Sequence, residues 1–245
     1  MSNKENNLRK LECELVSHGN KEKAQILSHF FKTGRGEYGE GDIFLGITVP
    51  VSRNIARKYQ ELSFEEIAKL FESKFHEERL VALLILVQKY KLASLKKDLV
   101  QKKKIYNFYL TKTKYINNWD LVDLSSHYIV GNYLIDKDRK ILDKLAKSKN
   151  LWEKRIAIIS TFAFIYKGEA DYTFRIVRIL LNDKHDLIHK ACGWMLREVG
   201  KRVSGEKLES FLKENSKKMP RTMLRYAIEK LPEEKRKYYL EYSKK

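Results

Sequence analysis

The triplet Arg155-Ile156-Ala157 decides the fold, because two similar triplets follow it at a regular spacing. Lys190-Ala191-Cys192 and Arg225-Tyr226-Ala227 again place a cationic residue one or two positions before an alanine in a segment with helix-like apolar spacing. The last alanine of each segment lies 34 and then 36 residues after the one before. A period of about 34–38 residues with two helices per unit is typical of an α-solenoid of the HEAT or TPR type.

The repeat extends toward the N-terminus. In the segment Arg79-Leu80-Val81-Ala82, the alanine lies 75 residues before Ala157, which leaves room for two periods. Residues 119–130 supply the helix expected between them. The glycine and aromatic positions of TPR units are missing. We therefore predict an all-α fold, a superhelical α-solenoid of HEAT-like repeats with a concave basic face. An ordinary helical bundle is the alternative.

Local signals place the first elements. Ser63 followed by Glu66 forms a capping box that starts a helix at Phe64, and a second helix should run from about Glu77 to Tyr90. Pro50 suits the first turn of a helix beginning near Val51. The glycine-dense segment 34–42 should be a loop. Its Gly-x-Gly-x-x-Gly spacing has no preceding strand, so a dinucleotide site is rejected.

Composition excludes several classes of protein. The chain has 245 residues, 43% hydrophobic and 33% charged, which indicates a globular protein. Eleven Gly and three Pro are too few for a many-stranded β-sandwich or barrel. The longest aliphatic run, Leu80–Val87, is far shorter than the ~18 residues of a membrane span. We expect a cytoplasmic monomer without a membrane partner.

The net charge suggests the partner. Fifty Lys and Arg against 32 Asp and Glu give +18, a surplus that attracts polyanions, nucleic acid above all. Runs such as Lys102-Lys103-Lys104 can equally be solvated surface. We predict one nucleic-acid-binding domain over 1–245, with a helical cap and glycine-rich loop at 1–62 and helical repeats at 63–245.

Candidate site residues lie on the second helix of successive repeats. Trp119 and Asp123 are one helical turn apart, and Arg155 is on the next such helix. Further cations and an aromatic at solenoid spacing could form a track for a phosphate backbone. These are Lys190, Trp194, Arg197, Arg221 and Arg225.

Each candidate also has a structural explanation. Trp119 could be a core residue, and Asp123 could form an ion pair with Arg155. Asp120 is explained by the first turn of a helix that Asn117 or Asn118 caps.

The sequence shows no other recognisable group of catalytic or metal-binding residues. His185 and His189 are spaced as two zinc ligands, but a third ligand is missing, and a helix cap at Asp183 or Asp186 explains the segment better. Two cysteines, Cys13 and Cys192, form no metal cluster. The sequence also holds no recognisable nucleophile motif or phosphate-binding loop. We expect neither metal nor cofactor.

Several segments in order resemble the AlkD-like DNA alkylation repair proteins, a family of HEAT-repeat DNA glycosylases. They are Gly39–Gly46, Trp119–Asp123, Leu151–Ala157, Ile188–Glu198 and Met219–Ala227. Together they run through almost the whole chain beyond about Leu27. The chain departs from the glycosylase branch at Asn118, where that branch has an aromatic residue, at Phe30 in place of Tyr, and in a longer loop around Tyr38.

The resemblance implies excision of N3-alkyladenine and N7-alkylguanine from double-stranded DNA that carries alkylated bases. It implies that Asp123, Trp119 and Arg155 are catalytic and that Trp194 contacts DNA. Lys154, beside Arg155, is added to the expected DNA contacts. A non-catalytic binder of distorted or branched DNA is the first alternative. A protein-binding scaffold or an RNA binder is the second.

Overall fold

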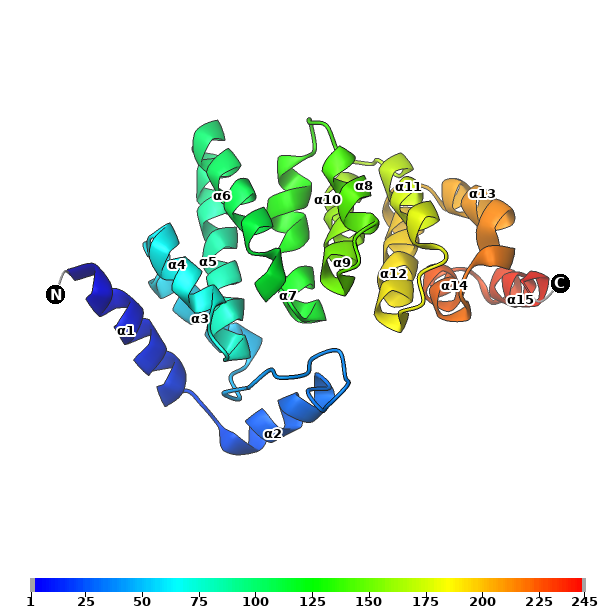
Figure 1. The fold of residues 1–245 in the computed structure, drawn as a ribbon. Coiled ribbons are helices and arrows are strands. Elements are labelled where there is room, and N and C mark those ends of the chain that lie inside the picture. The colour runs from blue at the N-terminus through cyan, green and yellow to red at the C-terminus, as the bar shows by residue number, and fades with distance from the viewer. Residues whose placement is uncertain (1–2, 244–245) are drawn as a thin grey trace. The chain divides into compact units, whose positions relative to one another are not determined.

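The computed structural model describes residues 3–243, and these fold as two compact units, one ending at Ser125 and the other beginning at Ser126. Both units are built from helices (Figure 1). Among the described residues no β-strand forms, and a single bridge joins Ile43 to Phe75. This confirms the predicted all-α, helical-repeat fold. The concave basic face and the single domain stay predictions.

Unit 1 is organised around one buried helix, α5. Its residues from 76 to 87 are all buried: the apolar run Val81–Val87 covers every side of the helix, and the polar residues 76–79 before it are buried as well. The helix packs against α1, α3, α4, α6 and α7. The elements of unit 1 are α1 (Asn3–Ser17), α2 (Lys21–Phe30), α3 (Val49–Lys58), α4 (Phe64–Phe71), α5 (His76–Leu95), α6 (Leu99–Thr111), the 3-10 helix η1 (Thr113–Tyr115) and α7 (Trp119–Asp123).

The predicted helix starts in unit 1 are largely confirmed. The Ser63 hydroxyl accepts a hydrogen bond from the Glu66 amide, and the Glu66 carboxylate accepts one from the Ser63 amide, so the capping box is complete. Helix α3 begins at Val49 with Pro50 in its first turn. Residues 34–42 form turns without a helix, as expected of the glycine-rich segment.

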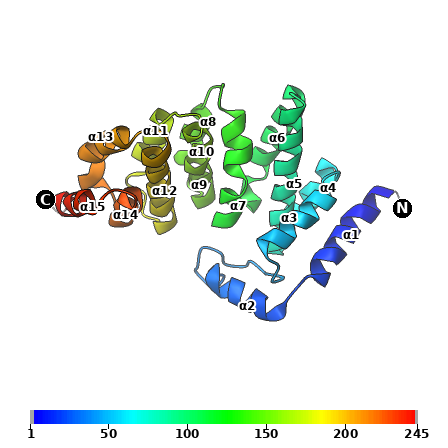
Figure 2. The same cartoon turned by 180° about the vertical axis from the view of Figure 1, so that it is seen from behind.

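Unit 2 is a stack of helices in two layers. Helices α9, α12 and α14 form one layer, with α12 between the other two (Figures 1 and 2), and α8, α11 and α13 cover it. The elements are the π-helix η2 (His127–Gly131), α8 (Lys140–Ala146), α9 (Leu151–Ser160), α10 (Phe162–Ile165), α11 (Asp171–Leu180), α12 (Asp186–Arg202), α13 (Gly205–Asn215), the 3-10 helix η3 (Ser216–Lys218), α14 (Arg221–Ile228) and α15 (Glu233–Tyr242). The three triplets that predicted the repeat therefore fall on neighbouring helices of one layer.

The approach of α12 to α14 depends on Gly193. A Cβ atom there would lie 2.5 Å from the carbonyl oxygen of Met223 and 2.5 Å from Cβ of Tyr226. Because neither of these atoms can move without shifting α14, the two helices could not keep this distance with a larger residue.

Gly193→Ala should therefore lower the free energy of unfolding by about 1–3 kcal/mol, the usual cost of overpacking. Urea denaturation measures the effect. Gly205→Ala is the matched control, since a Cβ at Gly205 meets no atom within 4 Å. Equal effects of the two substitutions would contradict the close contact at Gly193.

Two local predictions were wrong. The helix expected over 119–130 is interrupted, because α7 ends at Asp123 and the chain turns before η2. The cap of α12 is His185 rather than Asp183 or Asp186, since its imidazole accepts a hydrogen bond from the Leu187 amide at 3.2 Å.

Among the described residues, no helix is long and apolar enough to cross a bilayer.

Candidate functional site

Helix α7 carries two of the predicted site residues at its two ends. The Asn118 side chain accepts the Trp119 amide at 2.8 Å, which fixes the start of the helix as predicted. Trp119 is the first residue of α7 and Asp123 the last, and both side chains are partly exposed. Unit 1 therefore does not seal this indole and this carboxylate in its interior.

The Trp119 ring is held by two aromatic neighbours from the end of α2. It stacks on Phe31, with ring centroids 5.0 Å apart and planes 22° apart, and meets Phe30 edge-on at 5.9 Å. Phe31 is buried, whereas Phe30 is 60% exposed. One face of the indole is thus supported by a buried ring.

The Asp123 carboxylate lies close enough to Tyr109 to act on it electrostatically. Burial chiefly raises the pKa of the Tyr109 hydroxyl, its hydrogen bond with Ser125 opposes the rise, and the Asp123 charge adds to it. The Tyr109 hydroxyl and the Ser125 hydroxyl are 3.1 Å apart. Asp123 therefore lies near a buried pair of hydroxyl groups.

Beneath α7 lies a buried charged network that the sequence analysis missed. His76, the first residue of α5, is 1% exposed. Its Nδ1 lies 3.1 Å from a carboxylate oxygen of Asp42, and its Nε2 lies 2.8 Å from one of Asp120. The other Asp120 oxygen accepts the Leu121 amide at 2.8 Å, so Asp120 both supports the first turn of α7, as expected, and binds His76.

Asp42 is the hub of this network. Besides His76, it accepts hydrogen bonds from Arg79 at 2.5 Å and from Asn117 at 2.7 Å. Burial opposes ionisation of this carboxyl, but the His76 hydrogen bond and the Arg79 charge outweigh burial and lower its pKa. The end of the glycine-rich loop is thereby tied to α5 and to the segment before α7.

The charge state of His76 follows from its two partners. Burial by itself would lower the pKa of the imidazole, but the Asp120 charge and hydrogen bond, with those of Asp42, raise the pKa to about 9. At neutral pH the ring is an imidazolium that donates from both nitrogens. Its only sequence signal is a histidine at a helix start, because its partners lie 34 and 44 residues away.

In unit 2, Arg155 bonds to the first turn of α12, and Lys154 bonds to the segment before that helix. The Arg155 guanidinium is 5% exposed and donates to the Leu187 carbonyl at 2.6 Å. Lys154 pairs with Asp183 at 2.6 Å. Burial opposes ionisation of Asp183, but the hydrogen bond with Lys154 overcomes it and lowers the carboxyl pKa. These contacts join α9 to α12 and fix the direction of both cations.

Three further candidates lie along α12 at helical spacing. Trp194 is partly exposed, with its ring 5.8 Å from that of Phe162. Lys190 pairs with Asp186 at 2.7 Å, and Arg197 pairs with Glu229. Both cations therefore already have carboxylate partners within unit 2, which the sequence pattern did not reveal.

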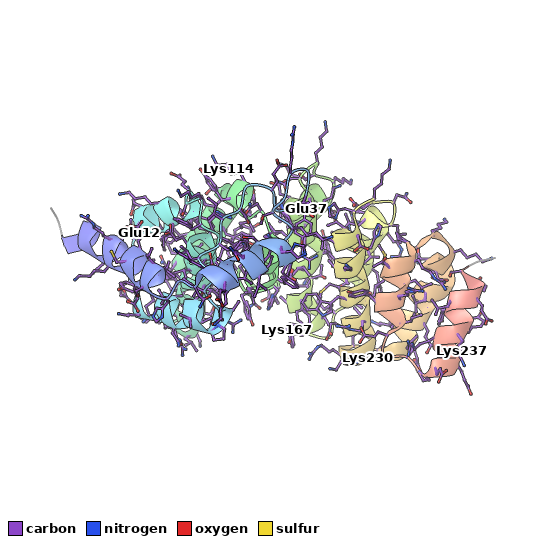
Figure 3. The ribbon with its side chains drawn as sticks, turned by 90° about the horizontal axis from the view of Figure 1, so that it is seen from below. Glu12, Glu37, Lys114, Lys167, Lys230 and Lys237 are labelled. Carbon is purple, nitrogen blue, oxygen red and sulfur yellow. The ribbon has the colours of Figure 1, made fainter. Side chains whose placement is uncertain are left out.

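The two candidate cations of α14 differ in their contacts. Arg221 donates to the Leu240 carbonyl at 2.8 Å and to the Ser243 hydroxyl at 2.9 Å, which attaches α14 to the end of α15. Arg225 is exposed one turn later on the same helix. Other lysines of unit 2, such as Lys167, Lys230 and Lys237, project from its surface (Figure 3). The structure thus brings Lys190, Arg197 and Arg225 onto adjacent helices, and their contact with DNA stays a prediction.

The chain matches the model of one protein family, described as DNA alkylation repair enzymes, over residues 11–231. The chain belongs to this family. It is similar to a solved structure, a predicted DNA alkylation repair enzyme from Enterococcus faecalis, with a TM-score of 0.65 and 19% identity over 88% of this chain and 98% of that one. That likeness shows the fold. No curated protein matches the chain.

Membership in the DNA alkylation repair family supports an enzyme that works in DNA repair, and DNA as its partner. Within residues 3–243, no three His, Cys, Asp or Glu side chains gather as a metal ion would require.

Proposed function

We propose that this protein is a DNA glycosylase that hydrolyses the N-glycosidic bond of cationic alkylated purines, N3-alkyladenine and N7-alkylguanine, in duplex DNA. The observation that carries the proposal is the pair of partly exposed side chains at the two ends of α7, an indole and a carboxylate one turn apart. Membership in the DNA alkylation repair family supports it.

The reaction requires few catalytic groups because the substrate already carries a positive charge. Alkylation leaves a positive charge on the purine, so the base departs without protonation by a general acid. As the bond breaks, positive charge develops on the deoxyribose. A carboxylate beside the sugar stabilises that charge electrostatically, as in glycoside hydrolysis. Asp123 takes this role and orients the attacking water.

The remaining residues bind and orient the damaged strand. Trp119 lies against the cationic nucleotide through its ring face, an attraction worth about 0.5–2 kcal/mol. Arg155 holds a phosphate of the damaged strand through its guanidinium group. Trp194 presses on the sugar-phosphate chain, and Lys190, Arg197, Arg221, Arg225 and Lys154 contribute charge toward the backbone.

The charge of the leaving base gives a direct test. The protein should release N7-methylguanine from a duplex but leave hypoxanthine, a neutral damaged base, attached, because Asp123 acts in this mechanism as a carboxylate and donates no proton to the base. Chromatography of the free bases after incubation measures both. Release of hypoxanthine at a comparable rate would overturn this mechanism, since it would require a proton donor.

A further inference from the structure

The buried His76 touches α7 by two separate routes. The first is the hydrogen bond to Asp120, the residue that follows Trp119. The second is aromatic, because the His76 ring stacks on Phe44 at 4.4 Å and lies 5.3 Å from Phe31, which itself stacks on Trp119. The position of the Trp119 indole is therefore linked to one imidazole on α5.

Helix α7 needs such support because it is short. Five residues form little more than one turn, and a helix of this length is unstable unless tertiary contacts hold it. Its orientation is consequently set by the side chains beneath it. Asp120, 6% exposed, is the charged one among the buried residues of α7.

A cavity adjoins His76 and its neighbours. A pocket of about 310 Å³ in unit 1 is lined by the rings of Phe30, Phe31, Phe44 and His76 and by Asp120. Helix α2, which forms part of its wall, buries none of its residues. Because this cavity leaves part of the surroundings unfilled, the ring is held by its stacking on Phe44 together with its polar links to Asp42 and Asp120.

We propose that His76, clamped between Asp42 and Asp120, is a positioning residue that fixes α7 and so sets where Trp119 and Asp123 stand. The effect on excision rests on the proposed glycosylase function. The effect on Trp119 does not, because it is a property of unit 1 with or without DNA. His76 acts through Asp120 and Phe31, and its ring nitrogens are occupied by the two carboxylates.

Three variants test the proposal. His76→Ala and Asp120→Ala remove the link and should lower the single-turnover excision rate by about 100-fold, the loss expected of a misplacement by about 1 Å. Affinity for the duplex should change far less, since cations of unit 2 supply it. Asp120→Asn should retain most of the rate, because its amide can donate to a neutral His76 while its carbonyl accepts the Leu121 amide.

The position of Trp119 is measured independently of activity by the indole N–H resonance in ¹⁵N-labelled protein. His76→Ala and Asp120→Ala should move this resonance, and Asp120→Asn should leave it near its original place. Leu70→Ala is the control for lost stability, because Leu70 is buried on α4 in the same unit and should leave both the rate and the resonance unchanged.

An unmoved Trp119 resonance in His76→Ala would overturn the positioning role, and so would an equal shift in Leu70→Ala. If the unaltered protein releases no base, the glycosylase proposal fails, while the resonance still decides whether His76 positions α7. If the alanine variants move the resonance and an active protein keeps its full excision rate, the claim that His76 positions the reacting groups is overturned.

Discussion

Asp123→Asn should lower the rate of base release from N7-methylguanine duplex by about 100- to 1000-fold, the usual loss when one preorganised electrostatic group is removed. The amide keeps the size of the side chain and removes its charge. Because the developing charge on the sugar is positive, an uncharged partner stabilises it poorly, while substrate binding depends on cations elsewhere. The affinity for the same duplex should stay within about threefold.

Single-turnover kinetics and fluorescence anisotropy on one protein preparation measure the two effects. Asp136→Asn is the matched control, because it makes the same change of charge at an exposed position of unit 2. A variant that releases base at the original rate would remove Asp123 from the mechanism. Equal losses in both variants would attribute the effect to net charge.

The second large effect concerns stability at alkaline pH. The pKa of His76 in the folded protein is about 9, above its ordinary value of 6.5. A raised pKa means that the folded state binds the proton more tightly than the unfolded chain does. The stabilisation is therefore complete below pH 6.5 and is lost as the pH rises through 9. Its size is about 3 kcal/mol, since each pKa unit corresponds to about 1.4 kcal/mol.

Urea denaturation of the unaltered protein and of His76→Gln, each at pH 6 and pH 9.5, measures this loss. The difference between the two proteins should shrink toward high pH, because other groups that titrate in this range contribute to both. Asp42 gives the opposite dependence, since its lowered pKa means stability lost in acid. A difference between the proteins that stays constant from pH 6 to 9.5 would show that the fold does not raise the pKa of His76.

The features that could be predicted from the sequence are those that a short segment or a regular repeat determines. The capping box of Ser63 and Glu66 spans four residues, so its two hydrogen bonds follow from the sequence alone. The layer of α9, α12 and α14 follows from a period, because a repeating unit buries its apolar face against its neighbours. The break after Asp123 was missed, since apolar spacing continues through residues that turn.

In the candidate site too, positions along one helix could be predicted, whereas contacts between distant segments could not. Trp119 and Asp123 could be placed on one helix from their spacing. The partners of His76 could not, because Asp42 and Asp120 reach it only through the fold. Likewise, the pairing of Arg197 with Glu229 bridges two helices and weakens a phosphate track that looked continuous in the sequence.

One measurement tests the central claim most directly, namely detection of free base after the unaltered protein is incubated with duplex DNA containing N7-methylguanine. The account predicts that the base appears in solution and that the strand acquires an abasic site that alkali cleaves. A protein that binds this duplex tightly, with a steep dependence on salt, and leaves every base attached would contradict it. That result would identify a DNA-binding protein without glycosylase activity.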